Sequence, residues 1–233
     1  SFSYNKDNPV LQDISFEIKR GEVIALVGPS GSGKTTIANM IPRFFDPESG
    51  SVFMDNRDFK TIHVDSLRKI MAMVTQEPVM FNATIRENIS YGRPDASEEE
   101  IVKAATLARA HDFISGMPDK YDTLVGERGF RLSGGEKQRI AIARALLINP
   151  DIIIFDEATS ALDTENEKYV QEAIDQVMEN RTVFIIAHRL STVSKADKIL
   201  VLDKGRIVQS GNHKDLITQP GLYKKLYEMN FEG

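Results

Sequence analysis

Cysteine is absent from this chain of 233 residues. Its absence excludes disulfide scaffolds, thiolate zinc sites and cysteine nucleophiles. Long apolar runs are also missing, because the most apolar region, residues 140–155, is interrupted by Arg144, Asn149, Pro150 and Asp151. A membrane-spanning helix needs roughly 20 consecutive apolar residues. We therefore expect a globular domain with no spanning segment of its own.

The chain also has no excess of positive charge. The chain has 29 Lys and Arg residues against 34 Asp and Glu residues, which gives a net charge of -5. A mildly acidic domain is a poor match for nucleic-acid phosphates, so we predict no nucleic-acid partner. Hydrophobic residues make up 41% and charged residues 27%, which is typical of one large globular domain or two coupled subdomains.

Three short apolar runs predict strands that are buried on both faces of a parallel sheet. They are residues 23–27, 152–155 and 183–187. Helical patterns lie between these runs, so the predicted fold class is α/β. Residues 51–54 and 198–208 are predicted to form further strands, and the second of these stretches contains a hairpin turn at Asp203, Lys204 and Gly205.

Residues 77–148 have a different pattern. Two helix starts of the capping-box type occur there, Thr84 with Glu87 and Ser97 with Glu100. Apolar residues follow at helical spacing, namely Ile101, Ala104, Ala105 and Ala108. We predict a mostly helical subdomain inserted between two strands of the core. The alternative is that this segment is part of the core layer itself.

A phosphate-binding loop is predicted after the first apolar run. Residues 28–35 read Gly-Pro-Ser-Gly-Ser-Gly-Lys-Thr, and a helix-compatible stretch follows at residues 36–41. Glycines let successive backbone N–H groups curl around a phosphate, and the helix N-terminus adds partial positive charge. Lys34 is predicted to reach the β- and γ-phosphates of a nucleotide, and the Thr35 hydroxyl to bind Mg²⁺. The predicted nucleotide-binding residues here are Gly28, Ser30, Gly31, Ser32, Gly33, Lys34, Thr35 and Thr36.

Two carboxylates, Asp156 and Glu157, end the second apolar run. The carboxyl edge of a parallel sheet is where open α/β proteins bind ligands. Asp156 is predicted to hold Mg²⁺ through water, and Glu157 to polarise the water that attacks the γ-phosphate. In the alternative interpretation, both carboxylates only cap the next turn.

A second anion-binding nest is predicted at Ser133, Gly134, Gly135 and Glu136, before a helix over residues 137–148. The alternative is an ordinary N-cap with a flexible turn. Since the chain has only one phosphate-loop lysine motif, the second nest acts either in the same chain or on the phosphates of another copy.

In their order and spacing, these motifs resemble the nucleotide-binding domain of an ATP-binding cassette (ABC) transporter, from Tyr4 to about Leu226. The segment from Leu132 to Glu136 resembles the signature motif of that family, in which glutamine is more common than Glu136. The resemblance implies a Mg²⁺-dependent ATPase with ATP and Mg²⁺ as cofactors. It also implies a three-layer phosphate-loop core at residues 1–76 and 149–233, with a predominantly parallel sheet, an antiparallel β subdomain and a helical subdomain at 77–148.

Several roles are implied by the resemblance alone. Tyr4 resembles the aromatic residue that stacks on adenine, and Gln76 the glutamine that touches Mg²⁺ and the attacking water. His188 resembles the histidine that contacts the γ-phosphate, although by residue type alone a structural histidine is the commoner case. Residues 160–163 resemble the loop that crosses to a partner. The implied catalytic residues are Glu157, His188, Gln76 and Lys34, and the implied metal ligands are Thr35, Gln76 and Asp156.

The resemblance also implies partners. In this family the signature of one subunit closes over the ATP of another, so we expect a head-to-tail dimer, with a homodimer as the simplest form. Residues 76–81, 84–89 and 123–129 resemble exporter segments, and the chain most resembles bacterial lipid-flippase and multidrug half-transporters. We therefore expect a transmembrane domain upstream of Ser1 and a location on the cytoplasmic face of the inner or plasma membrane. An importer ATPase subunit and a non-transport cassette are the alternatives.

Overall fold

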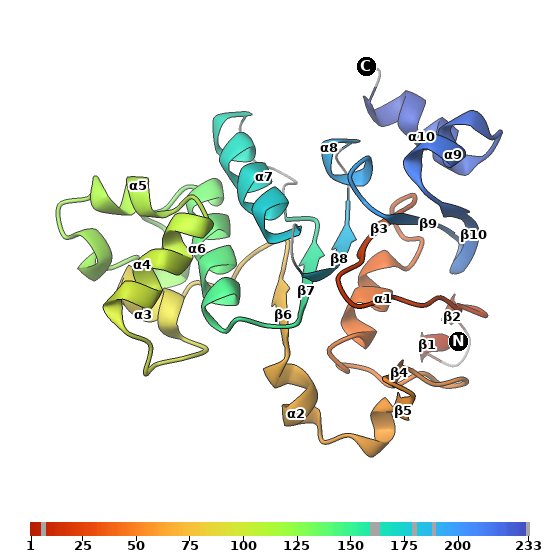
Figure 1. Cartoon of the computed structure of the whole chain (residues 1–233), viewed down its shortest axis with the longest axis horizontal. Helices are drawn as coiled ribbons and strands as arrows, with labels where there is room; N and C mark the ends of the chain where they lie inside the picture. The colour runs from red at the N-terminus through yellow and green to blue at the C-terminus, as the bar shows by residue number, and fades with distance from the viewer. Residues whose placement is uncertain (6–7, 159–163, 179–180, 188–189, 232–233) are drawn as a thin grey trace.

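The computed structural model describes residues 1–5, 8–158, 164–178, 181–187 and 190–231. Figure 1 shows an elongated molecule with a helical lobe at one end and sheets at the centre and the other end. The strands are β1 (Phe2–Asn5), β2 (Asn8–Leu11), β3 (Val23–Val27), β4 (Phe53–Met54), β5 (Arg57–Asp58), β6 (Met71–Val74), β7 (Ile152–Asp156), β8 (Thr182–Ile186), β9 (Lys198–Asp203) and β10 (Arg206–Gly211). The α-helices are α1 (Lys34–Met40), α2 (Val64–Lys69), α3 (Ile85–Ser90), α4 (Glu98–Leu107), α5 (His111–Ser115), α6 (Gly134–Leu147), α7 (Thr164–Met178), α8 (Leu190–Val193), α9 (His213–Thr218) and α10 (Leu222–Phe231). Short 3₁₀ turns occur at Phe59–Thr61, Lys120–Asp122 and Glu127–Gly129.

The main sheet has six strands in the order β10-β9-β3-β8-β7-β6. The pairs from β9 to β6 are parallel, and only β10 runs antiparallel to its neighbour. The three predicted apolar strands are the adjacent strands β3, β8 and β7, which confirms the α/β class and the predominantly parallel sheet. The hairpin predicted over residues 198–208 is also confirmed, as β9 and β10.

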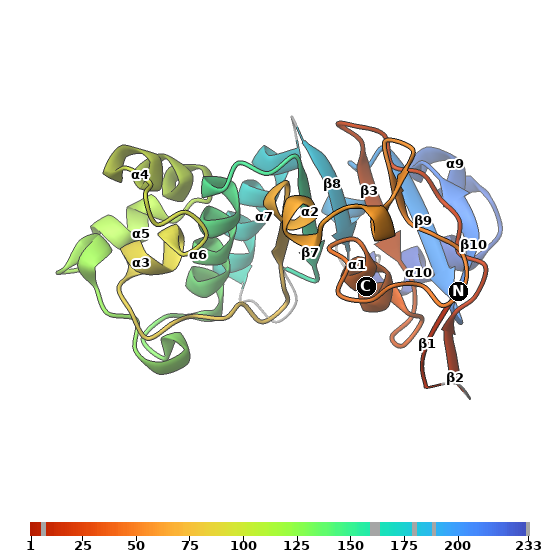
Figure 2. The same ribbon diagram turned by 90° about the horizontal axis from the view of Figure 1, so that it is seen from below.

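Two small antiparallel hairpins, β1–β2 and β4–β5, lie beside the main sheet (Figure 1), and Figure 2 shows β1 and β2 from below. The strand predicted at residues 51–54 is wrong in its extent, since only Phe53 and Met54 pair with β5. The reason is the two-residue turn that joins the strands, in which Asp55 and Asn56 have φ values of 49° and 62°. Left-handed turn residues favour a tight hairpin, and the two-residue partner strand limits the ladder.

The chain between β6 and β7 is helical, and it forms the lobe of α3, α4, α5 and α6 (Figure 1). Both predicted capping boxes are present, at the starts of α3 and α4. Helix α6 begins at Gly134 instead of the predicted residue 137, because a third capping box starts it: Ser133 Oγ accepts a hydrogen bond from the Glu136 N–H. The central helix α6 packs against α3, α4 and α7.

Strand residues alternate between two buried layers, as the period of two requires. Ala25, Phe155 and Ile185 belong to the larger core on the side of α6 and α7. Leu26 and Phe184 belong to the second core, on the side of α1. This is the three-layer arrangement expected of a doubly covered parallel sheet.

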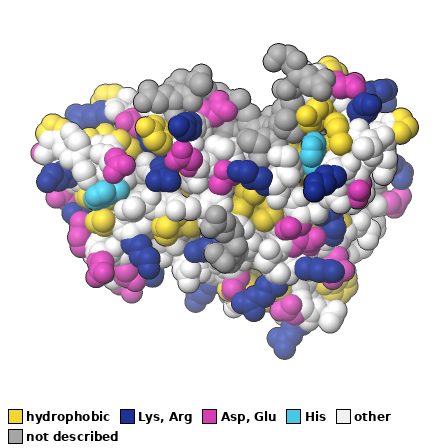
Figure 3. Space-filling view, turned by 45° about the horizontal axis from the view of Figure 1, so that its top comes forward, with side chains coloured by type: hydrophobic (Ala, Val, Ile, Leu, Met, Phe, Trp, Pro, Cys, Tyr) yellow, Lys and Arg dark blue, Asp and Glu magenta, His cyan; other side chains and the backbone are white. Residues whose placement is uncertain are grey.

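The surface carries charges of both signs. Figure 3 shows basic and acidic side chains interspersed over the face that it draws. No helix in the described ranges is long and apolar enough to cross a bilayer.

Removing a core ring should test this packing. Phe184 in β8 is fully buried, and its ring stacks on Phe16 at 6.1 Å between centroids. We expect Phe184→Ala to lower the free energy of unfolding by about 3–5 kcal/mol, because it leaves a cavity. The matched control is Phe53→Ala, because Phe53 is 61% exposed and its loss should cost no more than about 0.5 kcal/mol. Equal urea midpoints for the two variants would contradict the assigned core.

Candidate functional site

The predicted phosphate loop joins the carboxyl end of β3 to the start of α1. Gly31 and Gly33 have φ values of 75° and 105°, in the left-handed region that favours glycine. Gly28 is required for a different reason, since a Cβ there would overlap the backbone oxygen of Leu202 in β9. The loop therefore curls tightly at the centre of the sheet edge, with its backbone close to neighbouring strands.

Lys34 is the buried cation of this loop, with 6% of its surface exposed. Its ammonium donates to Gly28 O at 2.9 Å and to Pro29 O at 3.0 Å. Burial lowers the pKa of Lys34, while the carboxylates of Glu157 and Asp156 act in the opposite direction. The two acceptors, Gly28 O and Pro29 O, are neutral carbonyls. A phosphate oxygen can take their place as a stronger, charge-assisted acceptor.

Ser32 also fits a phosphate ligand. Its Oγ is buried, and it is one of two buried side-chain oxygens in the described ranges that have no hydrogen-bond partner, the other being Thr123 Oγ1. A buried hydroxyl without a partner costs free energy unless a ligand satisfies it. The loop thus combines curled glycines, a buried cation and an unsatisfied hydroxyl, which is the donor set that a polyphosphate needs.

The next two residues of α1 face different surroundings. Thr35 is exposed, whereas Thr36 is buried and its Oγ1 lies 3.1 Å from the Tyr4 hydroxyl. The Tyr4 ring meets Phe2 and Phe45 edge-on, at 5.0 and 5.4 Å between centroids, and remains 52% exposed. The ring is therefore held from behind and is accessible for stacking.

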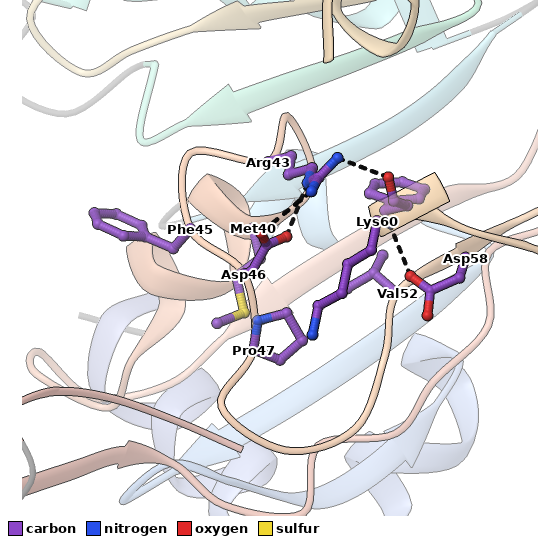
Figure 4. A pocket seen from close by; sticks show the side chains of 9 residues that line it. Met40, Arg43, Phe45, Asp46, Pro47, Val52, Asp58 and Lys60 are labelled. Atoms are coloured by element: carbon purple, nitrogen blue, oxygen red, sulfur yellow. Dashed lines mark hydrogen bonds and ion pairs between the residues drawn. The ribbon is translucent and has the colours of Figure 1, made fainter. Parts of the chain in front are cut away.

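A pocket is lined by Phe45, whose ring also contacts the Tyr4 ring (Figure 4). The Arg43 guanidinium occupies its edge, and it donates to Asp46 Oδ1 and to Phe59 O, both at 2.8 Å. These bonds tie the segment after α1 to the β4–β5 region. We interpret this pocket as structural.

The acidic edge follows β7. Asp156 is its last residue and is 7% exposed. Glu157 has a φ of 51°, which is unusual for a residue with a side chain, and its N–H donates to Ile186 O of β8 at 3.3 Å. Such strained backbone is found at functional sites, where the surrounding structure holds it in place.

The parallel sheet brings several predicted residues to one edge. Strands β3, β7 and β6 all end there, and they deliver the phosphate loop, Asp156 with Glu157, and the exposed Gln76. Within the described ranges, no group of three or more His, Asp or Glu side chains forms a metal site. The predicted set of one hydroxyl, one amide and one carboxylate suits Mg²⁺, which keeps several waters.

The second nest is built as a helix start. Ser133 and Gly134 are exposed, and the Glu136 carboxylate accepts from the Ser133 N–H at 2.7 Å. The Glu136 charge is therefore used to cap its own helix. Across the part of the chain that the structure describes, no hydrogen bond or ion pair joins this nest to the phosphate loop. The nest and the loop are thus separate features of one chain.

Two predictions lie outside the described residues, namely His188 and the loop at residues 160–163. Sequence reasoning also missed two polar residues of α6. Gln138 is 2% exposed and donates to Thr75 O, next to Gln76, at 3.2 Å, and Arg139 is 6% exposed. The sequence does not single these two residues out, because they continue the polar run that begins with Glu136 and Lys137.

The family model described as "ABC transporter" matches residues 11–160. The chain belongs to the ABC transporter family, as the fold and the loop at the sheet edge also indicate.

Relatives named as exporters are similar over nearly the whole chain. An ATP-dependent lipid A-core flippase from Syntrophus aciditrophicus is 52% identical over 232 residues, covering 100% of this chain and 38% of that protein. A multidrug export ATP-binding/permease protein from Staphylococcus aureus is 51% identical over 230 residues. The match covers 98% of this chain and 40% of that protein. A solved structure, that of a bacterial Atm1-family ABC exporter with ATP bound, matches with a TM-score of 0.92 and 48% sequence identity. The match covers 99% of this chain and 40% of that chain. The chain thus spans about two fifths of the length of these proteins.

The unsatisfied Ser32 hydroxyl gives a direct test of the site. We expect Ser32→Ala to leave the free energy of unfolding unchanged or slightly raised, because it removes a buried polar atom without a partner. MgATP affinity should fall about tenfold, since a hydrogen bond to a charged group is worth about 1.5–3 kcal/mol. Thr123→Val is the matched control, because it removes the other such hydroxyl and should not change affinity. Unchanged affinity in Ser32→Ala, measured with a fluorescent ATP analogue, would contradict the assignment.

Proposed function

We propose that this chain is the motor domain of an ABC exporter, and that it binds and hydrolyses ATP with Mg²⁺. The observation that carries this proposal is Lys34, a buried cation inside a glycine loop and near the carboxylates of Asp156 and Glu157. The core would comprise residues 1–76 and 149–233, and the helical subdomain residues 77–148.

Nucleotide binding would use groups that already point into the loop. The Lys34 ammonium exchanges its two carbonyl partners for β- and γ-phosphate oxygens, and the Ser32 hydroxyl gains an acceptor. Backbone N–H groups around Gly31 and Gly33 complete the cradle. Tyr4, which is held by Phe2 and Phe45, offers its exposed ring to the adenine.

Hydrolysis would take place at the carboxyl edge of β7. Thr35, Asp156 and Gln76 would hold Mg²⁺, which neutralises charge on the phosphates. Glu157 orients a water and accepts its proton as the water oxygen bonds to the γ-phosphorus. The bond to the β–γ bridging oxygen breaks, and ADP and phosphate leave. Gln76 positions the water, and His188 is assigned a contact with the γ-phosphate by the family resemblance.

The nest from Ser133 to Glu136 is assigned to the ATP of a second copy. Its separation from the phosphate loop supports this assignment, because a nest that serves its own chain should contact its own loop. The proposed partners are a second nucleotide-binding domain in a head-to-tail homodimer and a transmembrane domain of the same polypeptide, at the cytoplasmic face of the inner or plasma membrane. The named relatives favour export of lipids or drug-like compounds.

Ser133→Ala tests this proposal, and Ser97→Ala is its matched control. Both serines cap a helix in the same way, each accepting from a glutamate N–H at 3.3 Å, and each loss should cost about 1 kcal/mol of stability. Only Ser133→Ala should slow MgATP hydrolysis, by about 100-fold, because it removes a donor to the reacting phosphate. Affinity of the dilute single chain for ATP should not change in either variant.

The readouts are phosphate release and binding of a fluorescent ATP analogue. If Ser133→Ala hydrolyses ATP as fast as Ser97→Ala, the composite site is wrong. If Ser133→Ala weakens ATP binding by the dilute single chain, the nest acts in the same chain and not on a partner.

A further inference from the structure

Arg139 is a charged residue in a buried position of α6. It is 6% exposed and lies one helical turn after Gly135 of the nest. Its guanidinium carbon lies over two aromatic rings, at 4.7 Å from the centroid of Phe113 and at 5.1 Å from that of Tyr169. Phe113 belongs to α5 and Tyr169 to α7, so one cation connects three helices.

The guanidinium also donates in three directions. Nε donates to Gly135 O at 3.3 Å, Nη1 to Arg109 O at 3.3 Å, and Nη2 to Asn166 Oδ1 at 3.0 Å. The three acceptors belong to the nest, to the segment that follows α4 and to the first turn of α7. A planar guanidinium can hold three such acceptors and stack on rings at the same time, whereas a lysine ammonium cannot.

Asn166 lies at the same junction, where the nest, α6 and α7 meet. A Cβ at Gly135 would overlap the Asn166 side chain, so the nest backbone and the first turn of α7 are in close contact. A further tie lies nearby, because Arg109 Nε pairs with Glu172 Oε2 of α7 at 3.2 Å. The nest is therefore seated against α7, the helix that follows β7 and Glu157 in the chain.

We propose that Arg139 and Asn166 are positioning residues for the nest at Ser133–Glu136. They act through Gly135: Arg139 fixes its carbonyl, and Asn166 limits where its backbone lies. The inference rests on the proposed function, in which the Ser133 hydroxyl and the N–H groups of the nest bind the phosphates of a second copy's ATP. These groups must meet a phosphate at hydrogen-bond distance, and a displacement of about 1 Å can cost about 100-fold in rate.

Arg139→Lys and Asn166→Ala test the inference. Arg139→Lys keeps the charge but loses the planar fork, and Asn166→Ala removes one acceptor of that fork. We expect each to lower kcat for MgATP about tenfold or more, while ATP affinity of the dilute single chain stays within about twofold of the parent. The double variant should be no slower than the slower single variant, since the two residues act as a unit.

Arg131→Lys is the matched control, because Arg131 also lies over a ring, that of Phe130 at 5.6 Å, but is exposed and outside this junction. It should retain the parent kcat. Circular dichroism and thermal unfolding check that each variant folds. If Arg139→Lys does not fold, Asn166→Ala still provides the test. A parent-like kcat in a folded Arg139→Lys or Asn166→Ala chain would overturn the inference, as would an equal loss of single-chain ATP affinity.

Ser133→Ala measured in parallel separates this inference from the proposed function. If Ser133→Ala is slow and the Arg139 and Asn166 variants are fast, the positioning role is wrong and the proposed function stands. If Ser133→Ala itself is as fast as the parent, the proposed function and the inference both fail.

Discussion

The site is organised around the Lys34 ammonium, a buried positive charge at the start of α1. Two loop carbonyls, Gly28 O and Pro29 O, hold it, and the carboxylates of Asp156 and Glu157 act on it electrostatically. Burial of an ammonium costs free energy that neutral carbonyls offset only in part. A polyphosphate would bring further negative charge to this buried ammonium. The loop therefore has a physical reason to bind such an anion strongly.

The parallel sheet is what makes this arrangement possible. Because β3, β7 and β6 point the same way, residues separated by more than a hundred positions in sequence reach one edge. The helical lobe lies between β6 and β7 in the chain. Gln76 comes before its first helix, and the nest at Ser133–Glu136 begins its last helix. Buried polar residues of α6 then connect that lobe back to the core: Gln138 reaches Thr75 O, and Arg139 reaches α7.

Much of this architecture was predictable from local sequence patterns. The apolar runs gave the strands of the sheet centre because strands buried on both faces need no alternation, and the capping boxes at Thr84 and Ser97 located two helix starts. The start of α6 was misplaced because glycines at residues 134 and 135 weaken a helical pattern, whereas the Ser133–Glu136 cap overrides that weakness. The role of Arg139 was beyond sequence reasoning, since Phe113, Tyr169 and Asn166 meet it only in the folded chain. The unsatisfied Ser32 hydroxyl likewise depends on its three-dimensional surroundings.

In the proposed head-to-tail dimer, one chain carries halves of two different ATP sites. The most direct measurement is MgATP hydrolysis per chain across two decades of protein concentration, with a sizing run at the lowest concentration. We expect a rate per chain that climbs with concentration as monomers pair. A rate that stays flat while the sizing run shows monomer would contradict it, because a single chain would then complete its own site.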